Sequence, residues 1–374
     1  MKAKKSELKL PERLQSLDVL RGFDMFWIIG GGGLIVALAE TTKWGWLQLI
    51  AGQMEHVRWE GFHFEDLIFP LFMFISGVAI PYAVTGKVEQ GMKRGALFNK
   101  ILKRGVLLVI FGIIYNGALK NGFSNMRIAS VLGQIGLGYL FAATIVLYTK
   151  SINTRVAWLA GIMSGIAIMQ LLVPVPGYGA GVLDQVGGMN AWLDRMFLPG
   201  RLHGGTFDPE GLLCIVSAVS VTLMGSLAGS ILRDGGAASQ RKASILAIAG
   251  VVLIIVALIL SPFYPIIKAA WTVPFNLLTA GISSLLLSFF YFAIDVKNWT
   301  KGIFSYKILF FKVIGMNSIT IYLGHAIIDF DHSSRFFTGW LASPMGGWVV
   351  ILGSVILEWM LLYYLYKKKI FLRV

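Results

Sequence analysis

The chain has 374 residues, of which 56% are hydrophobic and only 14% are charged. Soluble domains usually carry about 25% charged residues, so this composition predicts a protein of the lipid bilayer and argues against an ordinary soluble enzyme. The single cysteine, Cys214, excludes an intrachain disulfide and a cysteine-based metal site.

About ten apolar stretches follow the N-terminus, each near the roughly 20 residues that a membrane-spanning helix needs. They lie near residues 18–40, 64–84, 103–119, 127–149, 156–174, 211–232, 243–261, 273–294, 308–328 and 346–366. The basic segment 1–17 has no apolar core followed by a small-residue cleavage site, so we interpret it as a retained cytoplasmic tail. The sequence thus predicts an all-α polytopic membrane protein with one transmembrane domain, 18–366, and a second basic tail, 367–374.

The distribution of positive charge predicts the orientation of these helices. An even number of spans places both termini on one side, and the segments on that side hold 25 of the 33 lysine and arginine residues. Cytoplasmic loops are enriched in these residues, so we predict that both termini face the cytoplasm. The net charge of +14 then reflects topology and membrane contact, and nucleic acid is not expected as a partner. Two long loops, about 41–63 and 175–210, are predicted on the outer side, where function often resides.

The first span carries charges at membrane depth, which are costly and usually face an interior or a cavity. Asp18, Arg21 and Asp24 are three residues apart, so Arg21 can pair with either carboxylate. Two interpretations stay open: a mouth for an anionic ligand, or an ion pair that orders the helix end. The run 30–33 is four glycines, which permits either a break or close helix packing.

The densest polar stretch near an outer boundary runs from His56 to Pro70. A histidine such as His56 is suited to take a proton from an amine or hydroxyl near neutral pH. Asp66 starts the second span, where it could orient that histidine or cap the helix. His56 and His63 form only a loose pair without further ligands at coordination spacing, so no metal is expected.

Basic residues open the third span. Lys103 and Arg104 follow Lys100, and apolar residues follow Arg104 at once. A basic cluster at a helix N-terminus suits phosphate groups. Topology signalling and contact with lipid headgroups account for such a cluster equally well in physical terms and are the more common cause.

Polar residues on the outer side open two further spans. Arg127 opens the fourth span, with Gln134 two turns within it, and Asp208 and Glu210 open the sixth. Asp208 and the proline that follows it suit a helix N-cap and first turn, and the two carboxylates could equally hold an amine or hydroxyl substrate.

The ninth span carries polar residues near one face at helical spacing, namely Asn317, Ser318, Tyr322 and His325. They could serve as polar contacts between helices. Alternatively, His325 faces the same cavity as His56, and Asn317 or His325 donates a hydrogen bond to an oxyanion there.

In order along the chain, these motifs resemble those of a known family. The matching stretches are Ser16–Gly22, His56 with Asp66–Pro70, Arg127–Gln134, Asp208–Gly211 and Gly315–Ser318. The chain resembles a bacterial member of the heparan-α-glucosaminide N-acetyltransferase family, a group of transmembrane acyltransferases.

The resemblance implies a reaction in which acetyl-CoA from the cytoplasmic side acetylates an amino sugar on the other side. It implies that His56 is the catalytic histidine and that Asp66 is the acidic residue beside it, whereas His63 has no counterpart. Arg104 and Arg127 match family arginines. An acetyl-histidine intermediate and direct transfer both stay open.

Residues and resemblance together lead to two predicted binding sets. The set for acetyl-CoA is Arg21, Lys103, Arg104, Asn317 and Ser318, and the set for the acceptor is Arg127, Gln134, Asp208, Glu210 and His325.

The expected partners are an amino-sugar acceptor and membrane lipids, a homodimer stays open, and the expected location is a bacterial inner membrane. Two alternatives are a transporter or flippase of an anionic solute or lipid, which interrupted helices and intramembrane charges also fit, and an O-acetyltransferase of envelope glycans.

Overall fold

The computed structural model describes residues 14–118, 126–300 and 303–372. Within these ranges the secondary structure is helical and contains no strand, as the composition predicts. Most of the predicted N-terminal tail, with residues 1–13, lies outside the described residues, as do Lys120 and residues 373–374 of the C-terminal tail.

The helices are α1 (Gln15–Phe26), α2 (Gly32–Thr42), α3 (Gly45–Gly52), α4 (Glu65–Ile80), α5 (Gly86–Glu89), α6 (Arg94–Tyr115), α8 (Val131–Tyr148), α9 (Ile152–Leu171), α10 (Met189–Phe197), α11 (Leu212–Arg233), α12 (Ser239–Leu260), α13 (Val273–Tyr291), α14 (Ile303–Met316), α15 (Ser318–Ile327), α16 (Phe330–Met345) and α17 (Trp348–Lys367). The two predicted long loops and the connection between α12 and α13, residues 261–272, are the long connections that the site uses. Wider, π-helical turns continue α1, α4 and α13 at Trp27–Gly31, Pro81–Thr85 and Phe292–Val296.

The described residues contain eight helices that are long and apolar enough to cross a membrane, or nine if the bent pair α14–α15 forms one span. Of the roughly ten predicted spans, eight or nine are thus confirmed as candidates by length and composition. The remaining predicted stretch is α6, a 22-residue helix whose first half carries Lys100, Lys103 and Arg104, too much charge for a span by composition. The stretch 308–328 is not one straight helix either, because α14 and α15 meet at a bend of 68°. The predicted orientation stays a prediction.

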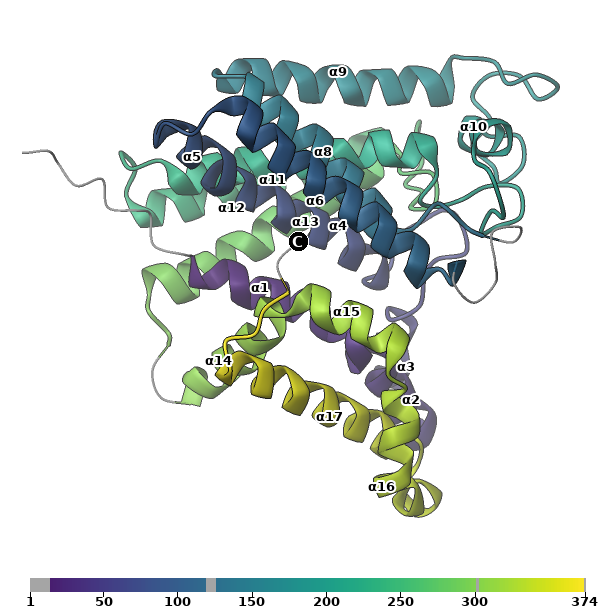
Figure 1. The fold of residues 1–374 in the computed structure, drawn as a ribbon. Helices are drawn as coiled ribbons and strands as arrows, with labels where there is room; N and C mark the ends of the chain where they lie inside the picture. Colours follow the sequence, from purple (N-terminus) through teal and green to yellow (C-terminus); the bar gives the residue numbers. More distant parts are fainter. Residues whose placement is uncertain (1–13, 119–125, 301–302, 373–374) are drawn as a thin grey trace, which may run out of the picture.

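The helices form two groups, and α1 joins them. Figure 1 shows α1–α3 beside α14–α17, although these segments come from opposite ends of the chain, and α4 to α13 gathered on the other side. α1 packs along α14 and also contacts α4 and α13, while α4 and α8 pack against α11. Residues near the N-terminus are thereby held against both groups.

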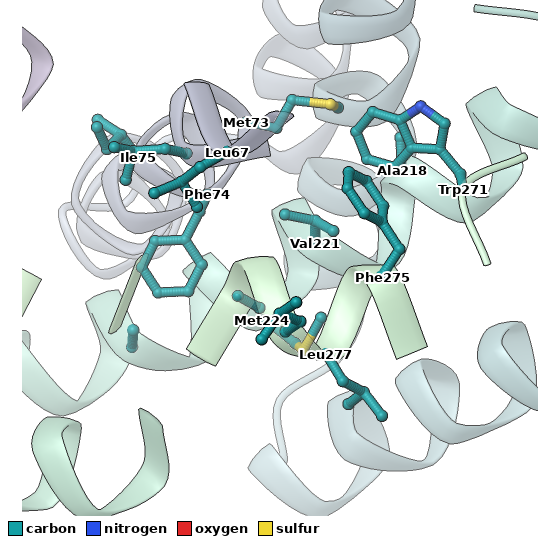
Figure 2. Close-up of a cluster of buried hydrophobic side chains, with 14 of the residues drawn as sticks. Leu67, Met73, Phe74, Ile75, Ala218, Val221, Met224, Trp271, Phe275 and Leu277 are labelled. Carbon is teal, nitrogen blue, oxygen red and sulfur yellow. The ribbon is translucent and has the colours of Figure 1, made fainter. Parts of the chain in front are cut away.

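The core of the second group lies where α4, α11 and α13 meet. Figure 2 shows Phe74, Val221 and Phe275 among its buried side chains, and each is at most 1% exposed. At Gly77 a β-carbon would overlap the backbone of α11, so this glycine allows α4 and α11 to approach closely. Small residues at helix contacts are typical of membrane bundles, where close packing drives association.

The glycine run contains the predicted break. Gly30 has φ of 135°, a conformation that L-residues rarely adopt, and it separates α1 from α2 within the first span. Both interpretations of this run hold, because the chain breaks at Gly30 and a β-carbon there would lie only 2.7 Å from the Val355 side chain of α17.

The two long loops lie toward one end of the bundle, near α3 and α10 in Figure 1, and contact each other. Trp59 of the first loop donates its indole N–H to the carbonyl of Leu183 in the second, at 2.9 Å. Its ring also meets Phe207 edge to face, at 5.2 Å between centroids. A third segment joins them, since the amide of Gly61 donates to the carbonyl of Ile266 at 2.9 Å. This contact brings the connection between α12 and α13 to the first loop.

Candidate functional site

A cavity of about 200 Å³ lies where the first loop meets the bundle. Its walls are mostly apolar and come from α1, α4, α8 and α15, among them Met25, Phe69 and Ile135. The polar side chains that line it are His56, Glu65, Glu210, Lys268, Ser318 and Tyr322. A mainly apolar cavity with a few convergent polar groups is typical of a site for a small reacting group.

His56 and Asp66 form a hydrogen-bonded pair at this cavity. His56 Nδ1 lies 2.9 Å from Asp66 Oδ1. The Asp66 side chain is fully buried, whereas that of His56 is 56% exposed. Asp66 Oδ2 also accepts the backbone N–H of His63 at 3.0 Å, which fixes the carboxylate. A carboxylate only accepts hydrogen bonds, so the contact with Asp66 favours the tautomer that has the proton on Nδ1 and the lone pair on Nε2.

Lys268 completes this group from the connection between α12 and α13. Its Nζ atom lies 2.9 Å from His56 Nδ1, 3.2 Å from His56 Nε2 and 3.3 Å from Asp66 Oδ1. Burial lowers the pKa of the Lys268 ammonium, and the charge of Asp66 offsets part of this effect. The sequence did not single out Lys268 as a site residue; it counted only among the basic residues predicted on the outer side. No local motif could reveal it, because 212 residues separate it from His56.

Two carboxylates also face the cavity. Glu65 stands next to Asp66 in the first turn of α4, and sequence reasoning gave it no role of its own. Glu210 was predicted to bind the acceptor, and its residue is 9% exposed. Burial raises the pKa of Glu210, against the opposing charge of Arg127.

Arg127 and Asp208 are held by each other beside the cavity. Arg127 Nε and Nη2 donate to the two oxygens of Asp208 at 2.8 and 2.6 Å, and Nη2 also pairs with Glu210. Burial alone would raise the pKa of Asp208, but the hydrogen bonds and charge of Arg127 outweigh it and lower that pKa. Of these three residues of the predicted acceptor set, Glu210 lines the cavity, and Arg127 and Asp208 do not.

Gln134 and Asn317 are buried near this region without lining the cavity. Gln134 Nε2 donates to the carbonyl of Cys214 at 3.1 Å. Asn317 stands at the bend between α14 and α15, where its Nδ2 lies 3.5 Å from the carbonyl of Val313. Ser318, the next residue, does line the cavity.

His325 is not brought to His56. Its Nδ1 lies 2.8 Å from Glu358 Oε1, a carboxylate that extends from α17. His325 lines a separate pocket of about 270 Å³ together with Asp329 and Asp331. The idea that both histidines share one cavity therefore does not match the structure.

The basic residues predicted to bind acetyl-CoA lie apart from the cavity. Arg21 Nη1 lies 3.5 Å from Asp18 Oδ1, so the pair predicted within the first helix is formed on the Asp18 side. Arg104 stacks over the ring of Tyr139, 4.2 Å from its centroid, and its Nε atom is buried without a hydrogen-bond partner among the described residues. Lys103 is exposed.

No group of three or more histidine, cysteine or acidic residues in the described ranges is arranged to hold a metal ion. His63, the other histidine of the first loop, has its Nδ1 2.8 Å from the carbonyl of Glu55. It does not line the cavity.

Comparison with known proteins confirms the resemblance seen in the motifs. The chain is 26% identical to the heparan-alpha-glucosaminide N-acetyltransferase of Homo sapiens over 98% of its own length, and 26% identical to that of Mus musculus over 97%. It spans about 60% of the length of these two relatives. Residues 13–179 match a family described as a domain of unknown function, DUF5009.

Proposed function

We propose that this multi-pass membrane protein is an acetyltransferase that moves an acetyl group from acetyl-CoA to the amine of a terminal glucosamine-type sugar. The observation that carries the proposal is the pair His56–Asp66 at the cavity, in a chain that is similar over nearly all its length to proteins named as N-acetyltransferases. The buried carboxylate can accept Nδ1–H, which leaves the Nε2 lone pair, 3.2 Å from the Lys268 ammonium, to act as a base or as an acetyl carrier.

Two routes use the same atoms. In direct transfer, the acceptor amine attacks the thioester carbonyl carbon, its proton moves to His56 Nε2, and the C–S bond breaks as CoA leaves. In the two-step route, Nε2 attacks the same carbon, CoA leaves, and the amine then takes the acetyl group from the imidazole. Both routes need a lone pair on Nε2 with a proton on Nδ1, and the Asp66 carboxylate can accept that Nδ1–H.

The cavity is smaller than the about 300–1,000 Å³ that is usual for a whole drug-sized ligand. At about 200 Å³ it would take the acetyl end of the donor and the amine of the acceptor, leaving the rest of each outside. The nucleotide end carries phosphates, and a basic group suits it. Arg104 fits that role, because its buried Nε lacks a hydrogen-bond partner among the described residues.

We propose that the donor enters from the cytoplasm and that the cavity opens toward the outer side of a bacterial inner membrane. The excess of lysine and arginine on one set of loops supports this orientation. The long loops that meet at the cavity belong to the opposite set, so the acceptor would be bound outside.

Acetyl transfer in reconstituted vesicles tests the proposal. Protein in vesicles receives radiolabelled acetyl-CoA and a panel of amino sugars, N-acetylated sugars and amine-free glycans. We expect label on free amines and its loss in His56→Ala, while His63→Ala, a matched change in the same loop, keeps activity. Label on hydroxyls alone would instead indicate an O-acetyltransferase. Solute uptake without any labelled product would refute transfer and favour a transporter.

A further inference from the structure

The cavity contains a cation that the two routes above do not use. Among the described residues that line it, Lys268 is the one side chain of lysine or arginine, and it faces Glu65, Glu210 and the His56–Asp66 pair. Its side chain is only 19% exposed. A buried ammonium that faces a cavity is a candidate for a functional group, because burying a charge is costly.

We propose that Lys268 is a catalytic residue, whose ammonium donates a hydrogen bond to the carbonyl oxygen of the acetyl group during transfer at His56. This inference rests on the proposed function. Sequence reasoning had suggested Asn317 or His325 for such a donor, but neither lines the cavity.

The distances support this role. When an acyl carbon reacts at or beside His56 Nε2, its carbonyl oxygen lies close to that nitrogen. Lys268 Nζ lies only 3.2 Å from Nε2 and is therefore within reach of this oxygen. The ammonium is also 3.3 Å from Asp66 Oδ1. This ion pair keeps the ammonium in place when it turns from the imidazole ring toward the carbonyl oxygen of the acetyl group. Donors that are held in place before the reaction stabilise charge that develops in the transition state.

A simpler role, as counter-ion of buried Asp66, accounts for only part of the geometry. Asp66 already accepts from His56 Nδ1 at 2.9 Å and from the amide of His63 at 3.0 Å. The Lys268 ammonium also lies 3.2 Å from Nε2, the ring nitrogen that keeps a lone pair when Asp66 accepts Nδ1–H, so it can donate a hydrogen bond there as well. Its place is therefore on the cavity side, where substrate would bind.

In the proposed step, the nucleophile bonds to the acyl carbon and the carbonyl electron pair moves to oxygen. Lys268 donates its hydrogen bond to that oxygen and keeps its proton. The pair then returns to carbon, the C–S bond breaks, and CoA leaves as the thiolate. When the nucleophile is the acceptor amine, its proton moves to His56 Nε2, so the step balances without a further reagent.

Kinetics of Lys268→Met and Lys268→Arg in the full chain test this role, with Lys150→Met as a matched change at an exposed lysine. Loss of one oxyanion donor typically lowers kcat by about 10²–10³-fold, so we expect a fall of about 100-fold in Lys268→Met and little change in acceptor KM. Lys268→Arg, which keeps the charge beside Asp66, should remain folded and retain part of the activity.

Acyl donors of different reactivity separate catalysis from a structural role. A fluoroacetyl thioester gives a less basic oxyanion, which gains less from a hydrogen bond, so the deficit of either Lys268 variant should narrow several-fold with that donor. A deficit that is equal for both donors overturns the proposal, as does full activity of Lys268→Met. If the wild-type chain transfers no acetyl group, the proposed function falls together with this inference; if only the Lys268 result fails, the proposed function stands.

Discussion

Replacement of Asp66 by asparagine should separate the orientation of His56 from the binding of substrate. The carboxylate is fully buried and accepts Nδ1–H of His56 at 2.9 Å. An amide of the same shape removes the charge, and it can present its NH₂ group to Nδ1, which would favour the tautomer with the proton on Nε2. His56 Nε2 would then carry a proton and could not accept one from the acceptor amine.

The size of the effect follows from the bond that is lost. Hydrogen bonds to charged groups contribute about 1.5–3 kcal/mol. At about 1.4 kcal/mol for each factor of ten in rate, their loss lowers kcat by about 10- to 150-fold. The wrong tautomer adds to this loss, so about 100-fold is the expected result, with acceptor KM nearly unchanged.

The assay is acetyl transfer by reconstituted protein, with kcat and acceptor KM measured for Asp66→Asn and for Glu60→Gln. Glu60 is exposed in the same loop and undergoes the same chemical change, so its variant should behave as wild type. Thermal unfolding of both variants checks that each is folded. A folded Asp66→Asn protein with kcat within about twofold of wild type would refute the reasoning, because the loss of even the weakest such bond exceeds that margin.

Two further predictions concern the arginines. Arg104→Ala should weaken binding of acetyl-CoA in calorimetry by about tenfold or more, since one charge-assisted hydrogen bond is removed; unchanged affinity would exclude Arg104 from the donor site. Arg127→Met should lower the free energy of unfolding by about 3–5 kcal/mol, because it leaves Asp208 buried and unpaired, while Arg58→Met at an exposed position should change it little. Since the pKa of Asp208 is lowered in the folded chain, this stabilisation exists above the ordinary value of 3.8 and is lost as the pH falls through the folded pKa. The gap between the wild-type and Arg127→Met unfolding curves should therefore close in acid, and a gap that widens there would contradict the assignment.

The features that sequence predicted best depend on short-range order. Apolar length located the spanning helices, and His56 and Asp66 are only ten residues apart, at a loop and the helix start that follows it. The bend at Asn317 was missed, because the apolar pattern of 308–328 is continuous across it. Periodicity reports which residues share a face of a straight helix, and it does not report where that helix turns.

Contacts between distant segments were the main gap. Arg127 and Asp208 were each singled out, but their pairing across 81 residues was not. Lys268 depends on the contact between Gly61 and Ile266, which is made by backbone atoms and leaves no side-chain signature. His325 shows the reverse error, since its helical spacing was correct while its partner, Glu358, lies on another helix.

The break at Gly30 also constrains the far end of the chain. The π-helical turn at this break replaces the usual pattern of backbone hydrogen bonds, for example with the N–H of Gly32 donating to the carbonyl of Trp27, and lipid offers no partner to a backbone group left over. That stretch of the first span must therefore be covered by protein. The nearest cover is α17, whose Val355 side chain stands directly over Gly30 and whose Ile351 lies beside it. The helix α17 thus packs over the break in the first span, so the first span reaches its packed form only once α17 is in place.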